Sequence, residues 1–221
     1  MWKWFLATFL LIEAKKGMSV NQLSGTLGVT TKSGWYLCHR IRAAMTPGTA
    51  KLSGVVEVDE TYIGGRASRG SRFVSNKTMV LGAIERGGKV WFDVSPFPYA
   101  SSSILKGFIG QHISDDAAAI YTDSHPGYDG IGGENTIHET VNHSGKEWVR
   151  GDVHTNTVES VWSLLDRAII GSYHQLSRKH LPAYLDELSF RFNNRENPHK
   201  FRDTLTRLCR SDVLTYERLV A

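Results

Sequence analysis

The sequence predicts an α/β protein with a small helical segment at its amino-terminal end. Two features of the 221-residue chain support this fold class. Apolar residues recur at helical spacing up to about residue 45, and β-branched strands then begin, in the order β-β-β-α-β followed by helices. The composition, 41% hydrophobic and 22% charged, is that of a globular protein and excludes a disordered or collagen-like chain.

The positive charge is concentrated near the amino terminus. The whole chain carries a net charge of +4, but residues 1–51 hold seven Lys or Arg and a single acid, Glu13, which amounts to +6. The rest of the chain is therefore mildly acidic, at −2. A basic segment joined to an acidic body favours a module that binds a polyanion.

Residues 2–16 are expected to form a buried helix. The uncharged run from Trp4 to Ile12 is nine residues long, well short of the roughly 20 that a bilayer requires. A signal peptide is the alternative, but charged residues follow at once and no small-residue cleavage site is present. The two cysteines, Cys38 and Cys209, suit neither a disulfide framework nor a Cys-based zinc site. We therefore expect a cytoplasmic protein with no membrane partner.

Residues 19–45 have the pattern of a helix-turn-helix. Ser19 can cap the first helix, Gly28 can form the turn, and Thr30 or Thr31 can cap the second helix. The second helix of such a motif enters a DNA major groove, although a plain helical hairpin has the same pattern. The basic charge favours DNA. The residues of this segment that we predict to contact DNA are Lys32, Arg40 and Arg42.

Residues 46–49 are typical of a linker, so we predict a helical domain at 1–50 and a second domain at 51–221. The strands expected in the second domain are 55–62, 79–85, 89–94 and 117–122, and the expected helices are 101–113, 154–170, 177–194 and 201–208. The Gly- and His-rich stretch 124–153 is expected to be rich in loops. A basic loop after the first strand is expected to contact DNA phosphates through Arg66, Arg69, Arg72 and Lys77.

Three carboxylates stand at positions where metal ligands are often found. Asp59 interrupts an apolar strand, Asp123 directly follows a later strand, and Glu159 lies near the start of a helix. An unpaired charge in an apolar strand is costly, so Asp59 requires a partner or a ligand. Mg²⁺ prefers a few carboxylate oxygens, and pairs of such ions promote phosphodiester transfer. Acids with a purely structural role are the alternative, and the residues alone do not decide between the two.

Three segments strongly resemble the IS1595/ISXO2-like family of insertion-sequence transposases. They are VEVDETYIGG at 56–65, YTDSHPGY at 121–128, and residues 154–195, which begin HTNTVESVWSLLDR. The resemblance implies a DDE-type transposase with an RNase H-like core, a mixed sheet flanked by helices. It also implies that Asp59, Asp123 and Glu159 are catalytic and hold two Mg²⁺ or Mn²⁺ ions. The implied partners are the element ends, target DNA and at least one further copy of the chain.

Three features of the sequence depart from the family pattern. Some members have Asn as the third metal ligand, and Asn156 lies one helical turn before Glu159. The family Lys that follows the third acid is Asp166 here, although the adjacent Arg167 can contact DNA instead. Relatives often begin with a Cys-rich zinc ribbon, so we expect the chain to be short at its amino terminus. An inactive DNA-binding descendant of a transposase is therefore the alternative, and a nuclease for RNA–DNA hybrids is a third hypothesis.

Overall fold

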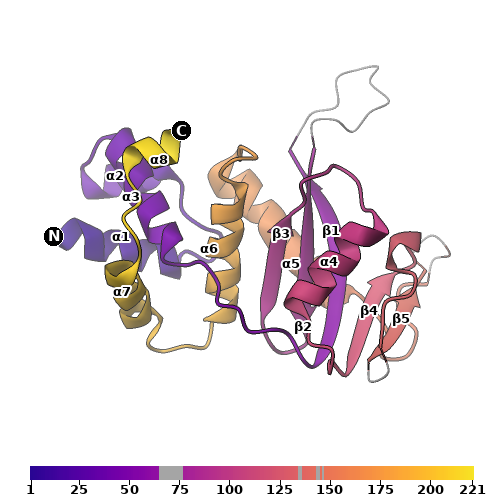
Figure 1. The fold of residues 1–221 in the computed structure, drawn as a ribbon. Coiled ribbons are helices and arrows are strands. Elements are labelled where there is room, and N and C mark those ends of the chain that lie inside the picture. Colours follow the sequence, from indigo (N-terminus) through magenta and orange to yellow (C-terminus); the bar gives the residue numbers. More distant parts are fainter. Residues whose placement is uncertain (65–76, 134–135, 143–144, 146) are drawn as a thin grey trace, which may run out of the picture. The chain divides into compact units, whose positions relative to one another are not determined.

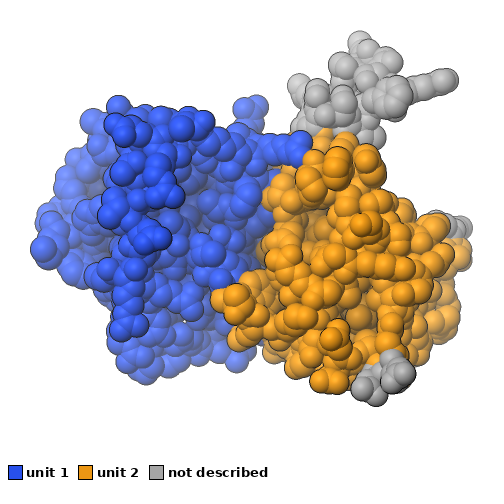
Figure 2. Space-filling model, viewed as in Figure 1, with its two compact units in different colours: residues 1–47, 164–221 blue, residues 48–163 orange. Residues whose placement is uncertain are grey.

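The computed structural model describes residues 1–64, 77–133, 136–142, 145 and 147–221. The chain divides into two compact units, which Figure 2 colours separately. Unit 1 contains residues 1–47 and 164–221, and unit 2 contains residues 48–163. Among the described residues, no helix has the length and apolar character needed to cross a membrane.

Unit 1 is helical. Its helices are α1 (Trp2–Glu13), α2 (Val20–Leu27), α3 (Thr31–Ala43), α6 (Leu181–Asn193), α7 (Lys200–Arg210) and α8 (Tyr216–Val220), together with a π-helical turn, η3 (Ile169–Tyr173). The Ser19 hydroxyl accepts a hydrogen bond from Gln22 N, and the Thr30 hydroxyl accepts one from Ser33 N. Gly28 has φ 59°, a left-handed conformation that glycine adopts without strain, and it ends α2. The two expected helices and their glycine turn are therefore present.

The carboxyl-terminal helices pack on the amino-terminal ones. Leu11, Leu23, Cys38, Ile41 and Phe190 share one buried cluster, which joins α1, α2, α3 and α6. Helix α1 also contacts α7, and α3 contacts α8. Residues 164–221 were expected to belong to the second domain, whereas in the structure they belong to unit 1. The sequence did not reveal this, because an amphipathic pattern shows which face of a helix is buried but not which element covers it.

Unit 2 is built on a five-stranded mixed sheet (Figure 1). Its strands are β1 (Val55–Ile63), β2 (Thr78–Glu85), β3 (Val90–Val94), β4 (Ala119–Asp123) and β5 (Ile137–Val141), in the spatial order β3-β2-β1-β4-β5. Strands β1, β2 and β3 pair antiparallel, whereas β4 pairs parallel to both β1 and β5. The remaining elements are α4 (Ser102–His112), the short 3-10 helix η1 (Pro126–Tyr128) and α5 (Asn156–Ala168), which begins in unit 2 and ends in unit 1.

The two faces of the sheet carry different side chains. On one face Val58 and Leu81 are buried in a cluster with Leu105 and Phe108 of α4. The alternate residues point to the opposite face, where the ring of Trp162 of α5 packs on Phe92 with 5.4 Å between ring centroids. A mixed sheet flanked by helices confirms the predicted RNase H-like fold class.

Strand β5 was not predicted and lies within residues 124–153, which were expected to be rich in loops. Its sequence, Ile137–Val141, contains His, Glu and Thr, and Ile137 is 60% exposed at the edge of the sheet. An edge strand has only one neighbour and less buried surface, so it needs fewer apolar residues than a central strand. The apolar run used to recognise the other strands is therefore missing here.

Candidate functional site

Asp59 and Asp123 occupy equivalent positions on two neighbouring parallel strands. Val55 of β1 is paired with Ala119 of β4, and Glu57 is paired with Tyr121. Continuing this register by two residues places Asp59 opposite Asp123, on the face of the sheet toward which α5 packs. The structure thus brings two of the three predicted acids together, and we call them the acid pair.

The surroundings of Asp59 make its negative charge unfavourable. Burial, together with the smaller effects of the nearby carboxylates of Glu60 and Asp123, raises the pKa of Asp59 to about 7. The indole Nε1 of Trp162 donates a 2.9 Å hydrogen bond to Asp59 Oδ2, which favours the charged form. A cation between the two aspartates would remove this electrostatic penalty.

The backbone after β4 orients Asp123. Its Oδ1 accepts a 3.0 Å hydrogen bond from His125 N, at the start of the turn that leads into η1. The neighbouring acid Glu60 points to the other face of the sheet, where the Tyr128 hydroxyl donates to its Oε2 at 2.7 Å. Burial raises the pKa of Glu60. Glu60 was not singled out from the sequence, although it follows Asp59 directly.

The third predicted acid is not brought into the acid pair. Glu159 is exposed on α5, and its Oε1 accepts a 3.0 Å hydrogen bond from the Thr155 hydroxyl. Asn156, the alternative third ligand, is also exposed, at the first position of the same helix. In the part of the chain that the structure describes, no three His, Cys, Asp or Glu side chains are grouped so that they could hold one metal ion. The three-residue metal site therefore stays a prediction.

A buried acid that the sequence analysis missed ties α5 to the sheet. Glu57 of β1 is fully buried, and its carboxylate accepts hydrogen bonds from Thr157 N at 2.7 Å, Thr157 Oγ1 at 2.7 Å and Val158 N at 3.0 Å. Glu57 lies two residues before Asp59 and thus on the same face of β1. Like Asp59, Glu57 is a charged residue inside an apolar strand. The same sequence signal could therefore have identified Glu57.

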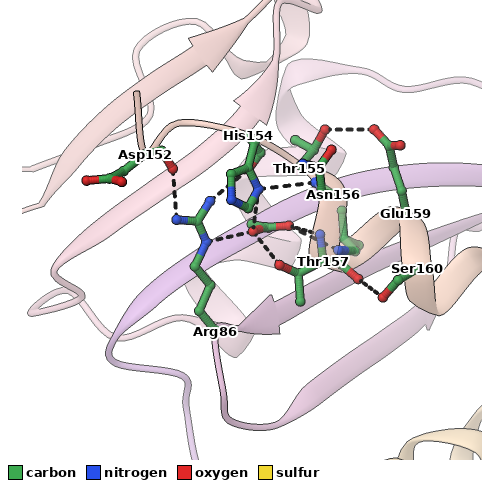
Figure 3. Close-up of polar contacts among 10 residues, drawn as sticks. Arg86, Asp152, His154, Thr155, Asn156, Thr157, Glu159 and Ser160 are labelled. Atoms are coloured by element: carbon green, nitrogen blue, oxygen red, sulfur yellow. Dashed lines mark hydrogen bonds and ion pairs between the residues drawn. The ribbon is translucent and has the colours of Figure 1, made fainter. Parts of the chain in front are cut away.

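Arg86 completes this contact. Its Nε donates to Glu57 Oε1 at 2.7 Å, and its other two nitrogens donate to the carbonyl oxygens of Asp152 at 2.8 Å and His154 at 3.1 Å. Figure 3 shows Arg86, His154 and Thr157 pointing toward one centre, while Glu159 extends from α5 toward Thr155. Arg86 lies in the short connection between β2 and β3.

The predicted DNA-contacting residues of α3 are engaged within unit 1. The Nζ of Lys32, which is exposed, lies 4.4 Å from the centre of the Tyr216 ring. Arg40 Nη1 donates to the carbonyl oxygen of Asp212 at 2.7 Å. Arg42 has a fully buried side chain, and its Nε lies 2.6 Å from Glu187 Oε2. Arg42 is therefore a correction to the sequence analysis, because a fully buried guanidinium does not reach a DNA phosphate.

The other predicted basic contacts lie elsewhere. Lys77 is exposed immediately before β2, and Arg167 is exposed in the last turn of α5 next to Asp166, which is also exposed. The remaining three residues of the predicted basic loop, Arg66, Arg69 and Arg72, lie outside the described residues.

Comparison with known proteins gives a family match and distant structural likenesses. The family model of the ISXO2-like transposase domain matches residues 51–193. An uncharacterized protein in the transposable element ISH50 of Halobacterium salinarum is 28% identical over 206 residues, which cover 86% of this chain and 68% of the relative.

Among solved structures, the Mos1 strand transfer complex is similar with a TM-score of 0.36 and 10% identity, covering 96% of this chain and 79% of that chain. A simian T-cell lymphotropic virus intasome in complex with the PP2A regulatory subunit B56 gamma has a TM-score of 0.36 and 14% identity, covering 76% of this chain. This chain spans 63% of the length of that intasome protein.

Proposed function

The chain belongs to the ISXO2-like transposase family, and from this premise we propose that it cleaves the ends of an insertion sequence and joins the freed 3′-OH to target DNA. The observation that carries the proposal is the acid pair, which lies inside the matched domain at equivalent positions of two parallel strands. Acids at neighbouring strand ends are what the family resemblance implied for a metal-dependent phosphodiester transfer.

The donor set of the acid pair fits a hard divalent cation. Mg²⁺ binds through one or two carboxylates and retains several waters, so Asp59 and Asp123 suffice to hold one ion. The raised pKa of Asp59 supports a cation here, since a bound positive charge offsets the cost of the buried carboxylate. Glu159, or Asn156, would complete a site for a second Mg²⁺ or Mn²⁺. When bound, such ions stabilise the attacking and leaving oxygens of a phosphodiester.

The residues of the chain orient the two carboxylates. Trp162 holds Asp59 Oδ2 by its indole N–H, and the His125 backbone N–H holds Asp123 Oδ1. Fixed carboxylates do not have to be ordered when DNA and metal arrive, which lowers the barrier to reaction. No covalent bond between protein and DNA forms in the proposed reaction, so no Ser or Tyr is assigned as nucleophile.

We place DNA contacts on exposed basic residues of both units. In unit 1 the exposed first turn of α3, with Lys32, would approach a groove, since recognition helices contact bases through their amino-terminal residues. Arg40, which is half-buried, can add a phosphate contact at the same helix. In unit 2 and α5 the proposed phosphate contacts are Arg66, Arg69, Arg72, Lys77 and Arg167. Joining two element ends requires at least a dimer on DNA.

The acid pair gives the first prediction. Asp59→Asn and Asp123→Asn should each abolish DNA cleavage and strand transfer in Mg²⁺ or Mn²⁺, because an amide removes the negative charge that holds the cation. DNA binding, measured by fluorescence anisotropy, should change by less than about twofold. The control is Asp116→Asn, an exposed acid of unit 2. Wild-type strand transfer by either pair variant would refute the site assignment.

A catalytically inactive, DNA-binding descendant of a transposase is the second candidate. Two observations favour it: Asp166 replaces the family Lys on the exposed side of α5, and Glu159 does not join the acid pair. Under this alternative the wild-type chain binds element-end DNA but does not nick it in either metal. Asp166→Lys distinguishes a damaged enzyme from one without activity, since it should raise cleavage only in the former.

A further inference from the structure

We infer that Glu57 and Arg86 are positioning residues for the metal-dependent reaction, which act by holding the first turn of α5 and hence Glu159. We call this pair the α5 clasp. The inference rests on the proposed function for the reaction itself, whereas the clasp is given by the contacts of unit 2.

The clasp supplies acceptors for the first backbone donors of α5. The first backbone N–H groups of a helix have no partner within it, and a Ser or Thr just before the helix commonly accepts a hydrogen bond from one of them. Thr155 stands at that position, and its hydroxyl donates to Glu159 Oε1. The Thr157 and Val158 N–H groups are satisfied by Glu57, about 100 residues earlier in the chain. A carboxylate at this end of a helix is also favoured by the helix dipole.

Arg86 neutralises Glu57 and fixes the segment that enters α5. The Glu57 side chain is 0% exposed and that of Arg86 is 25% exposed, so the pair is largely removed from water. A buried carboxylate is tolerated only when it is paired and hydrogen-bonded. Arg86 also donates to the Asp152 and His154 carbonyls, and its guanidinium lies 4.8 Å from the centre of the Tyr121 ring of β4. One arginine thus connects β1, β4 and the chain that leads into α5.

Two successive positions on one face of β1 therefore fix α5 on either side of Glu159. Glu57 binds Thr157 and Val158, directly before Glu159, and Asp59 binds Trp162, three residues after it. The separation between Glu159 and Asp59 consequently depends on both contacts. Weakening the clasp frees the first turn of α5, while the Trp162 contact still keeps the helix on the sheet.

The variants that test the inference are Glu57→Gln and Arg86→Gln. Glutamine has nearly the shape of glutamate, but its single acceptor oxygen cannot replace the two carboxylate oxygens that bind four donors. Arg86→Gln keeps the Glu57 carboxylate and removes only its charged partner. This variant can therefore test the inference even if Glu57→Gln folds poorly. Arg150→Gln is the matched control, since the exposed Arg150–Glu139 pair at 3.4 Å also lies in unit 2 and Arg150 donates to the Thr140 carbonyl of β5.

Two measurements on the full chain separate positioning from a general loss of structure. Hydrogen–deuterium exchange at Thr157 and Val158 should become at least about tenfold faster in the clasp variants, while exchange in β2 and β3 stays as in wild type. The Kd for the second Mn²⁺ ion, which the proposed function assigns to Glu159, should rise about 10- to 100-fold when measured by electron paramagnetic resonance with Mn²⁺ alone, as is usual when a residue that orients a metal ligand is removed. Single-turnover cleavage should fall similarly, and added Mn²⁺ should partly restore it.

The outcomes are distinct. If exchange at Thr157 and Val158 becomes faster but the Mn²⁺ Kd stays as in wild type, the clasp only stabilises the helix. If exchange at these residues is unchanged, the clasp does not hold α5. Either result overturns the inference. Asp59→Asn provides the separate test of the proposed function. If that variant binds Mn²⁺ as tightly as wild type, the metal site of the proposed function is wrong, whatever the clasp variants show.

Discussion

At the scale of single residues, Gly82 shows how tightly the surroundings of the acid pair are packed. Gly82 lies opposite Asp59 in the β1–β2 register, and a Cβ placed on it would lie 2.5 Å from the ring of Trp162. The Gly82→Ala methyl group would displace the indole that holds Asp59. We expect a loss of about 1–3 kcal/mol in the free energy of unfolding, measured in urea, together with slower cleavage.

The control for Gly82 is a helical glycine with open space around it. A Cβ on Gly107 of α4 meets nothing within 4 Å. Gly107→Ala should therefore stabilise the protein by about 0.5–1 kcal/mol, because alanine loses less backbone entropy in a helix. Equal stabilities for the two alanine variants would contradict the packing described for Trp162.

His39 makes unit 1 sensitive to acid. Burial lowers the pKa of His39 from 6.5 to about 3, and the charges of Arg42 and His180 act in the same direction. The unfolded chain takes up a proton below about pH 6.5, but the folded chain does so only near pH 3. The resulting contribution to stability is present above about pH 6.5 and is lost as the pH falls toward 3.

The variant that isolates this effect is His39→Phe, which keeps an aromatic ring beside Trp35 and Tyr184. Between pH 7.5 and pH 4, the free energy of unfolding should decrease more for the wild type than for the variant. Urea titrations at several pH values measure the difference. Parallel pH profiles would mean that His39 is protonated in the folded protein.

At the scale of elements, a buried ion cluster joins α3 to α6. Arg42 of α3 and Arg191 of α6 both contact Glu187, which also accepts a hydrogen bond from the Tyr173 hydroxyl. Glu187→Gln leaves two buried guanidinium groups without a carboxylate, and we expect a loss of about 3–5 kcal/mol. Glu196→Gln, with a side chain 89% exposed, should change stability by less than about 0.5 kcal/mol. Similar losses for both would contradict a structural role for Arg42.

Elements also show where sequence-based prediction stops. The central strands were predictable because their buried residues form apolar runs, whereas β5 was not, because its polar residues suit an exposed edge. The α5 clasp joins residues about 100 positions apart, a separation that no periodicity reveals. The proximity of Asp59 and Asp123 was implied by the family resemblance and not by the residues alone, because Asp59 lies in the middle of β1 and only Asp123 ends its strand.

At the scale of the whole molecule, the segregation of charge remains the main sequence feature linked to DNA. Of the three residues of α3 that were predicted to contact DNA, Lys32 is exposed, Arg40 is half-buried and Arg42 is fully buried. Only the first two can contribute to a phosphate contact. Net charge therefore predicted the kind of partner that the proposed function requires, but it did not predict which residues would face that partner.

The basic residues of the predicted loop after β1 allow a test of this electrostatic interpretation on the full chain. Each Lys or Arg that contacts a phosphate releases condensed counterions and adds about 0.9 to the slope of log Kd against log salt concentration. Replacing Arg66, Arg69 and Arg72 together by Gln should therefore reduce the slope by about 2–3 on element-end DNA. The same change at Lys89, Lys106 and Arg150, which are exposed basic residues of unit 2, removes equal charge and should leave the slope within about 1 of wild type. An equal reduction in both triple variants would assign the effect to net charge, and the loop would then have no specific part in holding DNA.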